Sequence, residues 1–283
     1  MTSRVPVPEI VAYYEPKTQD LLRRYGPGPR LHYHTGIIDE PGPLDISLSA
    51  LRKEIVAAQE RVLHHAAKIW QAQSTLCGEV VDVGCGLGGG ALFWAQEFGA
   101  QVTAVTCVPS QVEWVARFAA QAGVASRVHP LLCDALEIPG ENRFDTAVAV
   151  DSCCHIPRQA LFDRLATLLR PGGRVFVTDC FLVRPEYEEL FNRHWHVRIG
   201  TMEEYRTAAR QAGLREESVE EISPRVEYFW AMTHALIQAE ARGKKLTAPE
   251  GAKFTEALQA HALVRQGLAD GGYRYALMSF CKS

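Results

Sequence analysis

A glycine-rich loop between two apolar runs is the feature that most restricts the fold of this chain. The stretch Val80 to Thr106 reads VVDVGCGLGGGALFWAQEFGAQVTAVT and contains six glycines. An apolar strand, a loop almost without side chains and a helix starting near Ala91 are typical of the first β-α unit of a nucleotide-binding sheet. A tight turn needs only one or two glycines, so the others predict a ligand against the main chain. Glycines that only pack the helix against the strand remain the alternative for the loop alone.

The middle of the chain alternates short apolar runs with segments of helical periodicity, and the last residues alternate like a strand from Tyr273 onward. This order predicts an α/β fold with a parallel sheet and crossover helices. The RPGGR stretch at residues 170–174 predicts a turn between the last of these helices and the next strand. The five expected strands of this region cover 80–83, 102–106, 128–132, 146–150 and 175–178.

Pro130 interrupts the third expected strand. Proline lacks the N–H that a central strand donates to its neighbour, so it is tolerated essentially only at a sheet edge. The third strand is therefore predicted to be an edge strand.

Charge and cysteine spacing exclude several classes of function. The chain carries 30 Lys and Arg against 33 Asp and Glu, a net charge of −3, which argues against nucleic acid and anionic membranes as main partners. The N-terminus lacks a signal-peptide pattern and no apolar run is long enough to span a membrane, so we expect a soluble, cytoplasmic protein. The eight cysteines form no C-x-x-C pair, which predicts reduced structural thiols and no metal site.

Four segments together resemble the class I S-adenosylmethionine-dependent methyltransferases. VVDVGCGLGGG resembles their first motif, LLCDALEIP the segment that meets the adenine, and FDTAVAVDSCCHIP and LLRPGGRVFVTD the motifs of the fourth and fifth strands. The resemblance covers about Val80 to Asp179, with the motifs in the family's order and spacing. It implies a Rossmann-like seven-stranded methyltransferase sheet of order 3-2-1-4-5-7-6 and S-adenosyl-L-methionine as cofactor. The third strand is an edge in that family, in agreement with Pro130.

The same resemblance implies which residues meet the cofactor. Asp82 would lie near the cofactor's ammonium group and Asp134 near the adenine amine. Many family members end the second strand with an acid for the ribose, whereas this chain has Thr106 followed by a cysteine, and Gln111 is expected to take over. The complete implied set is Asp82, Gly84, Cys85, Gly86, Thr106, Gln111, Cys133, Asp134, Ala135 and Asp151.

The remaining segments are expected to cover the acceptor. Residues 1–75 would form an N-terminal lid and helices, with a helical stretch from about 49 to 73. Residues 76–283 would form the methyltransferase core, with a lid insertion at about 181–212 and a helical segment at about 235–268. An exchange of lid segments within a homo-oligomer is left open.

Methyl transfer requires an aligned, desolvated acceptor beyond the carboxyl ends of the fourth and fifth strands. Asp151 stands at that point, and it is interpreted either as a base that orients the acceptor or as a helix N-cap. His155 is a second candidate base, or else a histidine satisfied by its own loop. RLHYHTGI and GGYRYALMSF are similar to segments of the geranyl diphosphate C-methyltransferases, which implies catalytic roles for Tyr33 and His34. Asp151 falls where that group has a catalytic glutamate, and aspartate reaches less far.

An isoprenoid diphosphate acceptor would need aromatic faces for a carbocation and cations for the diphosphate. The residues assigned to this task are Arg30, His32, His34, Arg193, Trp195, Tyr228 and Trp230; a solvated helix face and ordinary core packing are the alternative. Magnesium would enter through the diphosphate. The small-molecule acceptor could instead be a specialised metabolite methylated on nitrogen or oxygen. A cofactor-binding partner subunit without activity and a nicotinamide dehydrogenase are the alternatives outside this class.

Overall fold

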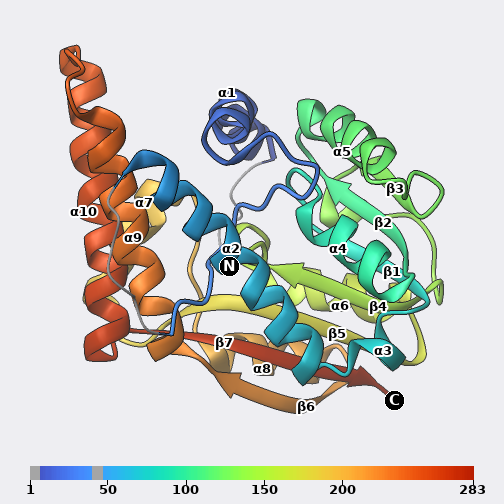
Figure 1. Cartoon of the computed structure of the whole chain (residues 1–283). Coiled ribbons are helices and arrows are strands. Elements are labelled where there is room, and N and C mark those ends of the chain that lie inside the picture. The colour runs from blue at the N-terminus through green and yellow to red at the C-terminus, as the bar shows by residue number, and fades with distance from the viewer. Residues whose placement is uncertain (1–6, 40–46) are drawn as a thin grey trace.

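The computed structural model describes residues 7–39 and 47–283, and its centre is a seven-stranded sheet (Figure 1). The strand order is β3-β2-β1-β4-β5-β7-β6, which confirms the predicted order. Strands β1 to β5 run parallel, whereas β7 is antiparallel to both β5 and β6. The strands are β1 Glu79–Val83, β2 Gln101–Thr106, β3 Val128–Leu132, β4 Phe144–Val150, β5 Leu169–Leu182, β6 Leu214–Glu221 and β7 Tyr273–Lys282.

Strand β3 forms the sheet edge, as Pro130 predicted. Pro130 stands opposite Ala104 of β2, which is the only neighbouring strand of β3 in the sheet. The missing N–H of proline therefore removes no hydrogen bond to a second neighbour. The predicted turn at residues 170–174 lies within the span of β5, with Gly172 at a φ of 75°.

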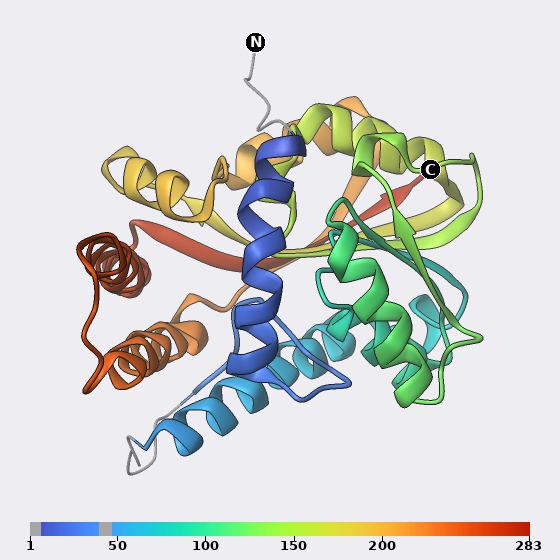
Figure 2. The same cartoon turned by 90° about the horizontal axis from the view of Figure 1, so that it is seen from above.

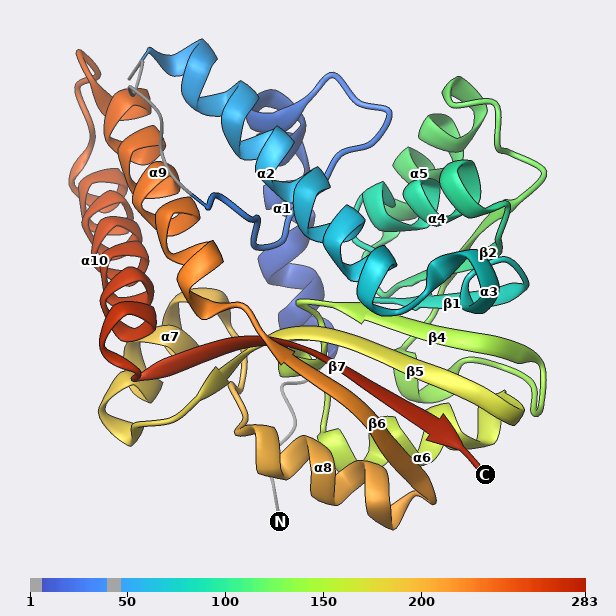
Figure 3. The same ribbon diagram turned by 60° about the horizontal axis from the view of Figure 1, so that its bottom comes forward.

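Both faces of the sheet are buried because helices cover each of them. Along β1, Val80 packs in one hydrophobic cluster, and Val81 packs in the other, as the alternation of side chains across a strand requires. Figure 3 shows the helices on the two sides. One cluster includes α2 Leu48–Ile69, α3 Ala72–Thr75, α4 Gly89–Phe98 and α5 Pro109–Gln121, and the other includes α6 Arg158–Leu168 and α8 Met202–Gln211.

The segments outside this core differ from the sequence prediction in two places. Helix α1, Val7–Tyr25, lies in the predicted helical N-terminal lid but outside the stretch of about 49 to 73 that was expected to be its helix, and it spans the space between α5 and the α9–α10 pair (Figure 2). The helical segment predicted at about 235–268 is two packed helices, α9 Ser223–Ala241 and α10 Ala248–Asp270. Residues 1–6 and 40–46 of the predicted N-terminal lid lie outside the described residues.

The other elements are short. After β5 the chain forms α7 Glu188–Trp195, and three 3-10 turns complete the structure: η1 Ala135–Glu137, η2 Cys153–His155 and η3 Pro185–Tyr187. None of the helices within residues 7–39 and 47–283 has both the length and the apolar composition needed to cross a bilayer.

Candidate active site

The three glycines of the G-x-G-x-G loop serve different purposes. All three have left-handed backbones, with φ of 72° at Gly84, 55° at Gly86 and 83° at Gly88. A Cβ at Gly84 would lie 2.6 Å from the Cβ of Ser152, and a Cβ at Gly88 would lie 2.9 Å from a methyl group of Val115. A Cβ at Gly86 would meet nothing within 4 Å. Gly84 and Gly88 therefore permit close packing, and Gly86 is the one that borders open space.

A fourth glycine brings the N-terminal segment to the loop. A Cβ at Gly89 would collide with the carbonyl oxygen of Leu31 and lie 2.5 Å from Nδ1 of His32. The loop therefore lacks side chains both where it borders the pocket and where it contacts the segment around Leu31 and His32. Both explanations considered for these glycines, space for a ligand and close packing, therefore apply to different positions of the loop.

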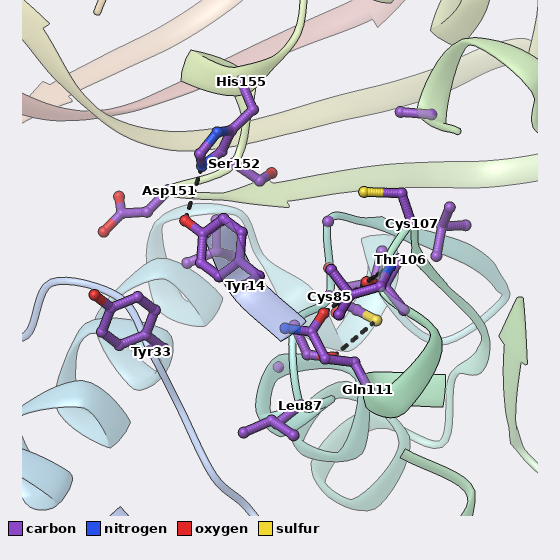
Figure 4. A pocket seen from close by; sticks show the side chains of 18 of the residues that line it. Tyr14, Tyr33, Cys85, Leu87, Thr106, Cys107, Gln111, Asp151, Ser152 and His155 are labelled. Atoms are coloured by element: carbon purple, nitrogen blue, oxygen red, sulfur yellow. Dashed lines mark hydrogen bonds between the residues drawn. The ribbon is translucent and has the colours of Figure 1, made fainter. Parts of the chain in front are cut away.

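The glycine loop opens into a pocket at the carboxyl ends of β1 to β4 (Figure 4). Gln111 lies buried beside β2, where its side-chain oxygen accepts a hydrogen bond of 2.6 Å from the hydroxyl of Thr106. Asp134 accepts a hydrogen bond of 3.0 Å from the N–H of Leu136, so it also caps η1. All ten residues that the resemblance assigned to the cofactor line this pocket: Asp82, Gly84, Cys85, Gly86, Thr106, Gln111, Cys133, Asp134, Ala135 and Asp151.

These residues fit S-adenosylmethionine. The open space at Gly86 accepts a flat group against the main chain, and Gln111 supplies a carboxamide for hydroxyl groups. Asp82 is 3% exposed, and burial raises the pKa of its carboxyl to about 7, although a hydrogen bond from the backbone of Ala91 acts to lower this pKa. A buried carboxyl of this kind is stabilised in its ionised form when a cation lies beside it.

We expect the cofactor affinity to fall as the pH drops below about 7, because the protonated Asp82 carboxyl cannot pair with an ammonium group. The decline should approach tenfold per pH unit where the free Asp82 is mostly protonated. Calorimetric titration with S-adenosylhomocysteine between pH 5 and 8 measures it. Asp82→Asn should bind weakly and without this pH dependence, whereas an equally steep decline in Asp82→Asn would assign the effect to another group.

Asp151 follows β4 and occupies a strained backbone conformation, with a φ of 48°. This left-handed region costs a non-glycine residue about 1–2 kcal/mol, although aspartate tolerates it better than most. Its Oδ1 accepts a hydrogen bond of 2.7 Å from the hydroxyl of Tyr275, and its Oδ2 accepts one of 2.7 Å from the N–H of Thr35. Burial raises the pKa of Asp151, and these two hydrogen bonds oppose the rise. This backbone conformation places the Asp151 carboxylate in the pocket lining and within hydrogen-bond distance of the N-terminal segment.

The interpretation of Asp151 as a helix N-cap is wrong. The residue before η2 is Ser152, whose hydroxyl donates to the carbonyl of Val83, and the residue before α6 is Pro157, which offers no side-chain cap. The carboxylate of Asp151 is engaged with distant parts of the chain and with no N–H of η2 or α6 among its described hydrogen bonds.

Aromatic side chains surround the space beside Asp151. The hydroxyl of Tyr14, on α1, lies 2.9 Å from Nε2 of His155, and burial lowers the pKa of His155 to about 4. The histidine is therefore neutral near pH 7. Tyr14 also packs edge-on against Tyr33, with ring centres 6.5 Å apart. In Figure 4, Asp151 and His155 lie on one side of Tyr14, and Cys85, Thr106 and Gln111 lie on the other side.

His34 is tied into a chain of hydrogen bonds. Its Nδ1 lies 2.8 Å from the carbonyl oxygen of Thr35, and its Nε2 lies 3.2 Å from Nδ1 of His32, whose Nε2 reaches Glu60 at 2.8 Å. Burial lowers the pKa of His34 to about 3, so the ring is neutral. Both ring nitrogens of His34 thus have partners within the protein, and the catalytic role that the resemblance implied for His34 stays a prediction.

Five residues assigned to the substrate from the sequence lie away from this pocket. Arg30 pairs with Glu60 at 3.1 Å and with Glu97 at 2.6 Å, and Arg193 lies on the exposed face of α7, paired with Glu189. Trp195 packs against Trp230 with ring centres 5.5 Å apart. The residues outside the pocket lining are Arg30, Arg193, Trp195, Tyr228 and Trp230.

A second, larger cavity of about 1020 Å³ adjoins the pocket, and the two share Leu21 and Tyr33. It lies among α1, α7, α9 and α10. Lys17 stands on its wall with Nζ 3.5 Å from the centre of the Tyr13 ring, and it takes part in none of the ion pairs recorded among the described residues. Burial and, to a smaller extent, the charge of Arg24 lower the pKa of Lys17 to about 7.

Sequence reasoning missed Tyr14 and Lys17 because it missed α1. Proline inside a helix removes a hydrogen bond, and Pro16 concealed this one. The signal was present, since Ile10, Thr18 and Tyr25, together with Tyr14 and Leu21, recur at spacings of three and four residues. Tyr275 was found as a strand residue, but nothing in the sequence joins it to Asp151.

The strand order is that of the class I methyltransferase fold. Residues 80–173 match the model of a methyltransferase domain. The protein is accordingly an S-adenosylmethionine-dependent methyltransferase.

Relatives of two kinds are similar to this chain. A geranyl diphosphate 2-C-methyltransferase of Streptomyces lasalocidi is 27% identical over 81% of this chain and 82% of its own length. A chloroplastic tocopherol O-methyltransferase of Arabidopsis thaliana is 30% identical over 52% of this chain, which spans only 42% of that relative. A solved geranyl diphosphate methyltransferase, in complex with GPP and sinefungin, has the same fold, with a TM-score of 0.80 at 20% identity over 98% of this chain and 99% of that one.

Proposed function

We propose that the protein methylates a carbon atom of an isoprenoid (prenyl) diphosphate, with S-adenosylmethionine as methyl donor. When bound, the cofactor supplies an electrophilic methyl group on a positively charged sulfur. An alkene that gains this methyl group becomes a carbocation, and it must lose one proton for the double bond to form again. The protein therefore needs aromatic faces, a base and a site for the diphosphate.

One arrangement carries this proposal: a strained, half-buried acid among aromatic rings, beside a cavity with a lysine that forms no ion pair to any described residue. Asp151 would take the proton, and the rings of Tyr14 and Tyr33 would lie near the positive charge. Lys17, in the adjoining cavity, would meet the diphosphate. The similarity to the Streptomyces enzyme along four fifths of both chains supports the same acceptor class.

Methylation on nitrogen or oxygen is the alternative, since matches to O-methyltransferases reach 30–33% identity over about half of this chain. The two classes differ in their need for a divalent metal and a diphosphate. Purified protein is incubated with methyl-labelled S-adenosylmethionine and prenyl diphosphates of increasing length, with and without EDTA. We expect transfer to carbon that EDTA abolishes and that the parent alcohols do not support. Labelled ethers or amines formed in EDTA would contradict the proposal.

Lys17→Ala should raise the KM for the diphosphate by about tenfold or more, because a hydrogen bond between charged groups contributes roughly 1.5–3 kcal/mol. The control is Arg193→Ala, which removes a cation of the neighbouring helix that is exposed and already paired. Initial-rate kinetics with both variants distinguish the two cations. Equal changes in KM would remove Lys17 from the diphosphate site.

A further inference from the structure

Tyr275 is the side chain of β7 that reaches Asp151. It stands opposite Cys180 in the antiparallel β5–β7 pair, so its ring lies next to the carboxyl end of β4. Tyr275 is fully buried, and its N–H donates a hydrogen bond of 2.9 Å to the hydroxyl of Ser223. The phenol is therefore fixed in place, and only its hydroxyl hydrogen can turn.

That hydroxyl has two partners. It lies 2.7 Å from Oδ1 of Asp151 and 3.4 Å from the hydroxyl oxygen of Thr178, which is also buried. The other oxygen of Asp151 faces the N–H of Thr35, and an N–H can only donate. A hydroxyl can donate or accept, so Tyr275 can adapt when Asp151 changes its charge, as can the side chain of Thr35, which also forms a hydrogen bond with Asp151. Tyr275 differs from Thr35 in that its hydroxyl has Thr178 as a second recorded partner.

We propose that Tyr275 is a positioning residue whose hydroxyl turns between Asp151 and Thr178, and so lets Asp151 gain and lose a proton inside a buried site. With the carboxylate ionised, the hydroxyl donates to Oδ1. With a proton on Oδ1, the hydroxyl accepts from Asp151 and donates to Thr178. No proton leaves Tyr275 in either state. The use of this device in catalysis rests on the proposed function, whereas the hydrogen-bond exchange itself does not.

Other ionisable groups face Asp151, and each must be held constant in a test. Asp179, on β5, is buried and accepts hydrogen bonds from the hydroxyl of Tyr205 and from the N–H of Cys180. The negative charges of Asp151 and Asp179 repel each other, which raises the pKa of Asp179. The positive guanidinium of Arg158, on α6, partly offsets this repulsion. The groups around Asp151 are completed by the thiols of Cys153 and Cys154 on η2 and of Cys180 on β5, all buried and protonated.

The titration of Asp151 is measured directly by NMR of protein that carries 13C in the aspartate carboxyl groups. The signal of Asp151 is identified by its loss in Asp151→Asn. In Tyr275→Phe we expect the midpoint to rise by about one to two pH units, because the ionised form loses a charge-assisted hydrogen bond. In Thr178→Val we expect the midpoint to fall, because the protonated form loses the arrangement in which Tyr275 accepts.

The matched control is Tyr273→Phe, on the same strand and equally buried, whose hydroxyl donates to the carbonyl of Tyr187 instead. It should leave the midpoint of Asp151 unchanged. Shifts of the same sign in Tyr275→Phe and Thr178→Val, or no shift in either, would overturn the inference. If Tyr275→Phe does not fold, the downward shift in Thr178→Val still decides. The titration uses no acceptor, so it stands even if no prenyl diphosphate is methylated.

Discussion

Gly86→Val is expected to abolish the binding of S-adenosylhomocysteine, with a loss of about 100-fold or more in affinity. The valine side chain would enter the open space that Gly86 borders, which the bound nucleoside is expected to fill. Forcing extra atoms into such a filled site costs roughly 1–3 kcal/mol in addition to the backbone strain. Isothermal titration calorimetry on the purified variant measures the loss.

Gly99→Val is the matched control, because it has the same kind of backbone and the same open surroundings. Gly99 ends α4 with a φ of 73°, and a Cβ there would also meet nothing within 4 Å, but it does not line the pocket. Both variants should lose stability by about the cost of a left-handed valine. Retained affinity in Gly86→Val, or equal losses in both, would mean that the space at Gly86 does not hold the cofactor.

Asp151→Asn is expected to reduce kcat by about 10²–10⁴-fold, the usual contribution of a general base. Affinity for S-adenosylhomocysteine should change little, because the cradle at Gly86 and the Thr106–Gln111 pair stay intact. Some stability should also be lost, since Thr35 and Tyr275 both donate to this carboxylate. Single-turnover rates and calorimetry separate the two effects.

Asp145→Asn serves as the control, at the other end of β4. Asp145 accepts a hydrogen bond of 2.8 Å from the N–H of Glu79 and pairs with Arg170, so its loss also affects stability. Turnover per folded molecule should remain normal in this variant. If Asp151→Asn melts early and turns over as fast as Asp145→Asn, the carboxylate is structural and the acceptor chemistry needs another base.

The fold and the cofactor pocket could be predicted because their determinants are local in sequence. Most of the residues expected at the cofactor lie at the end of a parallel strand or directly after it, and the carboxyl ends of parallel strands meet at one edge of the sheet. The segments after β1, β3 and β4 therefore come together whatever the rest of the chain does. Pro130 fixed one edge by its missing N–H.

The acceptor side could not be predicted in the same way because it depends on packing between distant segments. Arg30 and Arg193 were chosen for their charge. Arg30 is paired with Glu97, which is distant in the sequence, whereas Arg193 is paired with Glu189 four residues earlier on the same helix, a pair that its spacing could have indicated. Trp195 was chosen for its ring, and that ring packs against Trp230. Lys17, which forms no ion pair within residues 7–39 and 47–283, lies on a helix that a proline concealed.

The most direct test of the account is a calorimetric titration of the purified chain with S-adenosylmethionine, S-adenosylhomocysteine and NADH. We predict saturable binding of the first two at one site per chain and no binding of NADH. Failure of both sulfur nucleosides to bind, or binding of NADH alone, would contradict the account.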